Sequence, residues 1–183
     1  MAWTSPMTAI ANEVFTAAQY NQHIRDNLLE TAPALATTAG AHFVSVAANQ
    51  LVERVSASAT VATSETTTST TFTDLATVGP EVTVNTGTMA FVVIGCALGN
   101  AVGATGDAMM TYAISGTTTV AASDNSEVAR LIGDRNNFRY RASRASMVTG
   151  LTPGDNTFTA KYRSLNVAET ATFLERHIAV IPF

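Results

Sequence analysis

The residue types that most often carry out catalysis are present in this chain, but their spacing does not suit catalysis. The three histidines, His23, His42 and His177, are far apart, and none belongs to a His-x-x-x-His pair of the kind that binds zinc. The sequence has no Gly-x-Ser-x-Gly turn for a serine nucleophile and no glycine-rich phosphate loop. We therefore predict no catalytic residues, no bound metal and no cofactor.

Carboxylates are the remaining side chains that could perform acid–base chemistry. Glu127 and Asp134 could each pair with Glu169 or Glu175, because glycoside hydrolysis needs two carboxylates on either side of the scissile bond. Scattered acidic residues on strands and loops are more often solvated surface. The sequence therefore leaves this alternative open, and we expect a protein that is not an enzyme.

A cluster of arginines interleaved with aromatic residues favours binding over catalysis. Its members are Arg130, Arg135, Phe138, Arg139, Tyr140, Arg141 and Arg144. Arg139 and Arg141 are two residues apart, so in a strand both side chains project to one face. A planar guanidinium pairs bidentately with carboxylate or phosphate. The candidate docking patch for an acidic surface, a neighbouring subunit or an anionic glycan is Arg135, Arg139, Tyr140, Arg141 and Arg144. The alternative is a solvated strand face with local pairs to Asp134 and Glu127.

Composition limits the class of protein. Charged residues make up only 13% of the 183 residues, compared with about a quarter in an average domain, and the formal net charge is −4. A weakly charged surface rich in Thr, Ser and Ala suits a protein covered by neighbours, although a merely Thr-rich β protein would look the same. The acidic balance argues against nucleic-acid binding, and no apolar run is long enough to span a membrane. The only cysteine, Cys96, lies in an apolar run and is predicted to be a buried, unpaired thiol.

The elements that must position these residues begin with a short helix near the N-terminus. Thr16 followed by Gln19 fits a capping box, in which each residue binds the backbone amide of the other. Phe15 and Tyr20 are placed to form a hydrophobic staple across the start of this helix. Pro33 cannot continue the hydrogen-bond ladder, so we expect the helix to end near residue 31.

The helix carries one narrow apolar stripe. Tyr20, Ile24 and Leu28 recur at every fourth residue and are flanked by polar side chains. A helix of about four turns is marginal alone in water, so it must pack on its own chain, on copies of itself or on another protein. The predicted anchoring and assembly residues are Trp3, Phe15, Tyr20, Ile24 and Leu28.

This N-terminal stretch resembles the start of virion proteins of tailed bacteriophages, especially phages of actinobacteria. The resemblance rests on Trp3-Thr4, on the run from Glu13 to Asn21 and on the run from His23 to Leu28. This chain differs at three positions, where Asn12 replaces the usual Gly, Phe15 replaces Val and Tyr20 replaces Leu. Weaker similarity covers most of the remaining chain in patches and is poorest over residues 125–146.

The rest of the chain predicts a mainly β fold with an antiparallel β-sandwich, and a jelly roll is one candidate form of it. We expect a helical anchor over 1–31, a connector over 32–62 with a strand pair near 42–46 and 51–55, and a sandwich over 63–183. The predicted strands are 71–78, 81–85, 89–98, 108–115, 118–122, 127–132, 138–148, 156–164 and 170–181. The segment 89–98 is apolar on both faces, as expected of a central strand.

The resemblance implies a non-enzymatic virion structural protein that is assembled in the host cytoplasm. It implies self-association as a homotrimer and contact with other virion proteins of the capsid or the tail. A trimeric capsid decoration protein or head fibre is the first expectation, because the chain is short for a fibre that reaches the host. The alternative is a tail fibre or minor tail protein whose β domain binds a host-surface glycan through exposed aromatics such as Phe138 and Tyr140.

Overall fold

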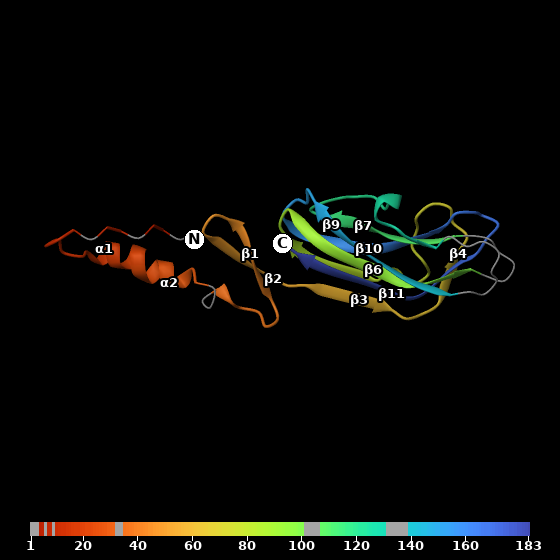
Figure 1. The fold of residues 1–183 in the computed structure, drawn as a ribbon, viewed down its shortest axis with the longest axis horizontal. Coiled ribbons are helices and arrows are strands. Elements are labelled where there is room, and N and C mark those ends of the chain that lie inside the picture. The colour runs from red at the N-terminus through yellow and green to blue at the C-terminus, as the bar shows by residue number, and fades with distance from the viewer. Residues whose placement is uncertain (1–3, 6, 9, 32–34, 101–106, 131–138) are drawn as a thin grey trace. The chain divides into compact units, whose positions relative to one another are not determined.

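The computed structural model describes residues 4–5, 7–8, 10–31, 35–100, 107–130 and 139–183. The chain divides into two compact units, residues 1–55 and 56–183. The named elements of the first unit form a helical stretch over residues 17–29 and an antiparallel hairpin (Figure 1). Its elements are α1 (Ala17–Tyr20), the π-helix η1 (Asn21–Asp26), α2 (Asn27–Leu29), β1 (His42–Ala47) and β2 (Gln50–Arg54).

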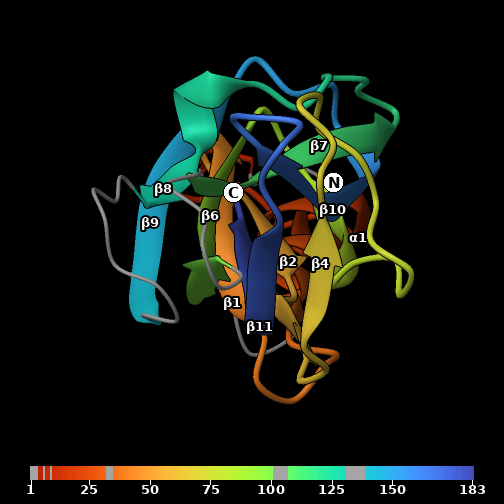
Figure 2. The ribbon, with the colours of Figure 1, turned by 90° about the vertical axis from the view of Figure 1, so that its right-hand side faces the viewer.

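The second unit is a two-sheet antiparallel sandwich, and the predicted fold class is confirmed. Its elements are β3 (Ala57–Val61), β4 (Glu65–Thr67), β5 (Glu81–Thr86), β6 (Met89–Asn100), β7 (Ala108–Gly116), the 3₁₀ turn η2 (Asp124–Ser126), β8 (Val128–Arg130), β9 (Tyr140–Thr149), β10 (Gly154–Ser164) and β11 (Ala171–Pro182). One sheet has the order β5-β10-β7-β8. The other has the order β3-β11-β6-β9, with β4 also paired to β11. Figure 2 shows the strands of these sheets from one end.

Alternation of apolar and polar residues explains which faces are buried. In β5, Val82 and Val84 point into the core while the residues between them are exposed. In β10, Phe158 and Tyr162 are fully buried, as the alternating sequence of that strand predicts. β6 pairs with β11 on one side and β9 on the other, so its prediction as a central strand is confirmed.

Several predicted boundaries are wrong because pairing between distant segments outweighs local composition. Within the segment 71–78 only Thr73 forms a bridge, and a short strand lies at 65–67 instead. Within 118–122 only Val120 forms a bridge. The predicted connector also contains β3, which pairs with β11 and therefore belongs to the sandwich. The predicted hairpin within that connector is present as β1 and β2.

A β-bulge in β11 brings an arginine into the core. Leu174 pairs with Ala97 and His177 with Gly95, so β11 carries one extra residue between these pairs. Glu175 in the bulge has a φ of 49°. Because the bulge shifts the alternation by one residue, Arg176 points inward and its side chain is fully buried.

The guanidinium of Arg176 is held by an ion pair and several hydrogen-bond acceptors. Its Nη2 lies 3.1 Å from Oε2 of Glu65 on β4, and its Nη1 donates to the carbonyls of Thr77 and Gly79 at 3.4 and 3.5 Å. The ring of Tyr162 lies below it, 5.3 Å from the guanidinium carbon to the ring centroid. A buried charge is tolerated because its partners replace water.

The ionisation of Glu65 should make the free energy of unfolding depend on pH in the acid range. Burial opposes ionisation of Glu65, but hydrogen bonds from the hydroxyl and amide of Thr77 and the charge of Arg176 outweigh it and lower its pKa. The stabilisation is therefore complete above the unfolded-state pKa of about 4.3 and declines as pH falls through the lowered folded-state pKa. In urea unfolding from pH 7 to pH 2.5, we expect the free-energy difference between wild type and Glu65→Gln to shrink with acidification. Parallel curves would contradict this assignment.

Candidate assembly site

The start of the helix is built as its sequence predicts. The Thr16 hydroxyl accepts a hydrogen bond from the Gln19 amide at 3.2 Å, and the Thr16 amide donates to Oε1 of Gln19 at 2.9 Å. The rings of Phe15 and Tyr20 meet edge to face, with centroids 6.2 Å apart. Asn12 has a φ of 68°, a conformation that Gly and Asn adopt at the lowest cost. The capping box and the staple are confirmed.

The apolar stripe of the helix is exposed to solvent. Tyr20, Ile24 and Leu28 are 50%, 40% and 59% exposed. The π-helical turn between α1 and α2 holds more residues than the roughly 3.6 of an α-helical turn. Residues four apart lie on successive turns of the same side of a helix, so these three exposed side chains form one apolar stripe. This helical stretch offers a partner one continuous apolar line.

Asn27 is a further residue of this unit whose role the sequence did not reveal. Its side chain accepts hydrogen bonds from the amide and hydroxyl of Thr4, both at 3.0 Å, and donates to the Thr4 carbonyl at 3.1 Å. It also donates to the carbonyl of His23. Asn27 thereby ties the segment before the helix to the last helical turn. The available signal was an asparagine inside a helix, where this residue is unfavourable unless its side chain bonds the backbone.

Replacing Asn27 with alanine should release the segment around Thr4. The substitution removes the three bonds to Thr4 and leaves two backbone groups of that residue to water, while alanine itself favours the helix. We expect faster amide hydrogen exchange at Thr4, by about tenfold, with unchanged exchange in the sandwich. Asn21→Ala, which removes a half-buried asparagine side chain near the start of the helix, serves as the matched control. Unchanged exchange at Thr4 in Asn27→Ala would contradict the proposed role of Asn27 in holding Thr4 against the last helical turn.

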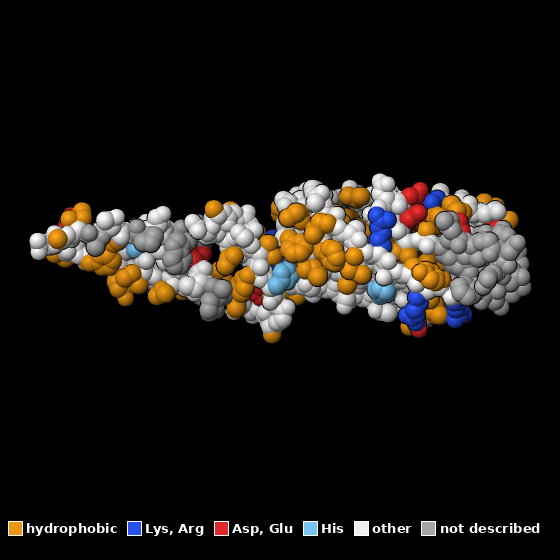
Figure 3. Space-filling model, viewed as in Figure 1, with side chains coloured by type: hydrophobic (Ala, Val, Ile, Leu, Met, Phe, Trp, Pro, Cys, Tyr) orange, Lys and Arg blue, Asp and Glu red, His pale blue; other side chains and the backbone are white. Residues whose placement is uncertain are grey.

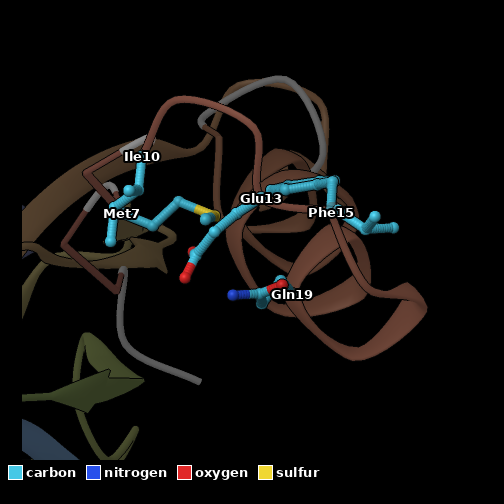
Figure 4. A pocket seen from close by; sticks show the side chains of 6 residues that line it. Met7, Ile10, Glu13, Phe15 and Gln19 are labelled. Atoms are coloured by element: carbon cyan, nitrogen blue, oxygen red, sulfur yellow. The ribbon is translucent and has the colours of Figure 1, made fainter.

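A groove lies beside the start of the helix. It is lined by Met7, Ile10, Glu13, Val14, Phe15 and Gln19 and has a volume of about 200 Å³. Figure 4 shows the side chains of Met7, Glu13 and Gln19 reaching toward the same space. Ile10 and Val14 are 62% and 85% exposed. The groove therefore extends the apolar surface of the helix toward the N-terminus.

The first unit has no apolar core within its described residues. Asn27 is the one described residue of this unit that is buried. The hairpin also exposes Phe43, Val46 and Leu51 by 37% to 46%. A two-stranded hairpin and a helix of this length are each marginal in water without packing. Among the described residues, then, this unit presents its apolar side chains outward. Of the predicted anchoring residues, Trp3 lies outside the described part of the chain.

The arginine cluster does not form one surface. Arg135 and Phe138 lie outside the described residues, and Arg139 is exposed just before β9. Arg141 lies on the outer face of its sheet and forms an ion pair with Glu175. Tyr140 and Arg144 lie on the other face of β9, where Nη1 of Arg144 donates to the carbonyl of Glu127 at 3.4 Å. The predicted docking patch is thus divided between the two faces of one strand.

Two of the candidate acid–base residues, Glu127 and Glu175, pair with different arginines, and Glu169 is buried. Arg163 lies 2.8 Å from Asp124 and 3.7 Å from Glu127, whereas Glu175 pairs with Arg141. Burial, followed by the nearby charge of Asp124, raises the pKa of Glu127. Asp134 lies outside the described residues. In the part of the chain that the structure describes, no three His, Cys, Asp or Glu side chains are grouped to hold a metal ion.

The thiol of Cys96 is buried in the sandwich core, and burial raises its pKa to about 12. Thiolates, not thiols, react with disulfide reagents. We expect the native protein to resist labelling by a disulfide reagent at pH 8 for hours and to react with one equivalent within minutes in denaturant. Rapid labelling of the native protein would place the thiol outside the core.

No protein-family model matches this sequence, and no curated protein matches it. None of the helices in the described ranges is long and apolar enough to cross a membrane.

Proposed function

We propose that this chain is a non-enzymatic structural protein of a tailed-phage virion that anchors through its N-terminal unit. One observation carries the proposal. The first unit has a well-capped helix and a hairpin, yet its described residues bury no apolar side chain. Such a unit gains its stability by packing on something else. The resemblance of residues 3–28 to phage virion proteins supplies the class of particle.

The assembly we propose is a homotrimer. Three copies of the stripe of Tyr20, Ile24 and Leu28 can close around one axis, because oligomers of identical chains favour closed symmetry. The apolar side chains that are exposed in one chain would then be covered. The choice of three chains comes from the resemblance. A capsid decoration protein or head fibre is our first candidate.

The second candidate is a tail fibre or minor tail protein whose sandwich binds a host-surface glycan. A hollow on the outer face of the sandwich, lined in part by the polar side chains of Arg141, Ser143 and His177, favours this alternative. The two candidates place the protein at opposite ends of the virion.

Locating the protein in the particle tests the proposal. A fusion of a small, rigid tag to the C-terminus, imaged in averaged virion maps, should give additional density on the head at symmetry-related positions. Density at the tail alone would overturn the capsid assignment and support the second candidate. Absence of the protein from purified particles would overturn both.

A further inference from the structure

The outer face of the sheet β3-β11-β6-β9 is mostly apolar. Hydrophobic side chains gather over β6, β9 and β11 in Figure 3, and Met89, Met147 and Ile181 on this face are 38% to 53% exposed. Phe91 and Val93 continue the row along β6. The row ends at Gly95, in the middle of the central strand.

Gly95 is required by a close approach of His177. A Cβ atom at position 95 would lie 2.6 Å from Cε1 of His177 and 2.8 Å from the carbonyl oxygen of Ala142. The imidazole therefore lies directly over the strand. Glycine weakens a strand interior, and it often marks a place where another group approaches the backbone closely.

The bulge in β11 creates this arrangement. If β11 alternated strictly from Leu174 without a bulge, Arg176 would point outward and the side chain of His177 would point into the core instead of out over Gly95. Glu175 takes a left-handed φ of 49° that is costly for a non-glycine residue. Bulges and such strained residues are concentrated at functional sites.

A hollow with both polar and apolar lining results at this point of the face. It is lined by Cys96, Arg141, Ala142, Ser143 and His177 and has a volume of about 230 Å³. Arg141 is paired with Glu175, so its positive charge is balanced. Guanidinium, hydroxyl, imidazole and carboxylate groups together supply both hydrogen-bond donors and acceptors.

We propose that this hollow binds one uncharged sugar ring of a polysaccharide. Sugar hydroxyls both donate and accept, which suits the mixed groups around the hollow, whereas the carboxylate of Glu175 opposes a free anion. Val93 and Ala145 pair next along the strands and offer apolar surface to the C–H face of a ring. The volume is below the roughly 300 Å³ of drug-sized pockets, so it suits one ring. This site deepens the second candidate function and does not depend on where in the virion the chain resides.

Saturation-transfer NMR on the full-length protein tests this site. The probes are glucose, galactose, arabinose and N-acetylglucosamine, with glucuronate and inorganic phosphate as anionic probes. We expect saturation of at least one neutral sugar and an affinity loss of at least about fivefold in Ser143→Ala and in His177→Gln, because each removes one hydrogen-bonding group. Ser143→Phe should abolish binding by filling the hollow from an exposed position on β9. The matched control, Thr172→Ala on the same face of β11, should bind like the wild type.

Two results would overturn the proposal. One is that no neutral sugar is saturated, including the case in which only phosphate or glucuronate binds. The other is equal binding by Ser143→Phe and wild type, with native circular dichroism showing that both are folded. Neither result bears on the assembly proposal. That proposal is tested by the position of the tagged protein in the virion and by the mass of the purified protein in sedimentation.

Discussion

Replacing Arg176 with alanine should destabilise the sandwich by about 3–5 kcal/mol, the largest stability effect that we expect in this chain. The substitution leaves the Glu65 carboxylate without its charge partner, and it leaves the carbonyls of Thr77 and Gly79 without the guanidinium donors. It also removes the group that packs on the Tyr162 ring. Urea unfolding at pH 7 should show a lower midpoint with an unchanged slope.

Two variants separate loss of charge pairing from loss of packing. The double substitution Arg176→Met and Glu65→Gln replaces both charged groups by uncharged groups of similar length. It should recover most of the unfolding free energy lost in Arg176→Ala, because replacing both members of a buried ion pair is often nearly neutral. The exposed Arg139→Ala should change stability by less than about 0.5 kcal/mol. If Arg176→Ala behaves like Arg139→Ala, the guanidinium is not part of the core.

Replacing Ile24 with aspartate should convert the proposed trimer into monomers. Burial of an aliphatic side chain is worth about 1.5–3 kcal/mol, and a threefold assembly would bring three aspartates together in one layer. We expect the dissociation constant to rise by at least about a hundredfold. Sedimentation of the full chain should then show a threefold fall in mass, to 19.1 kDa.

The sandwich should survive this change, because the two units have separate internal contacts. Gln22→Asp introduces the same charge at an exposed position outside the stripe and should leave the mass unchanged. In the proposed phage particle, both Ile24→Asp and removal of residues 1–31 should prevent incorporation. A wild-type chain that sediments as a monomer would refute the trimer, and normal incorporation of the shortened chain would refute the anchoring role.

The exposed arginines on β9 and just before it also protect the edge of their sheet. Within the described residues β9 pairs with β6 alone, so it is an edge of its sheet. Exposed charges on an edge strand discourage pairing with strands of other molecules. Arg139, Arg141 and Arg144 are all exposed at this edge. This is closer to the solvated-face interpretation of the cluster than to one docking surface.

Local rules determined what the sequence could predict. The capping box of Thr16 and Gln19 and the staple of Phe15 and Tyr20 involve residues within five positions of one another, so their spacing specifies their contacts. Strand alternation likewise explains the inward faces of β5 and β10. The segment 89–98, apolar on both faces, predicted a central strand, and β6 does pair on both edges, although Met89, Phe91 and Val93 on its outer face stay partly exposed.

Only the tertiary structure decided the features that depend on register between distant segments. One extra residue in β11 places Arg176 in the core and His177 over Gly95, and nothing in the alternation of β11 alone reveals that bulge. The clamp of Asn27 on Thr4 joins residues 23 positions apart. The sequence by itself therefore determined a capped helix with an exposed stripe and a β body. Pairing between distant strands decided which charged and polar side chains the β-sandwich buries and which it brings together. No local sequence pattern encodes the free energy of that pairing.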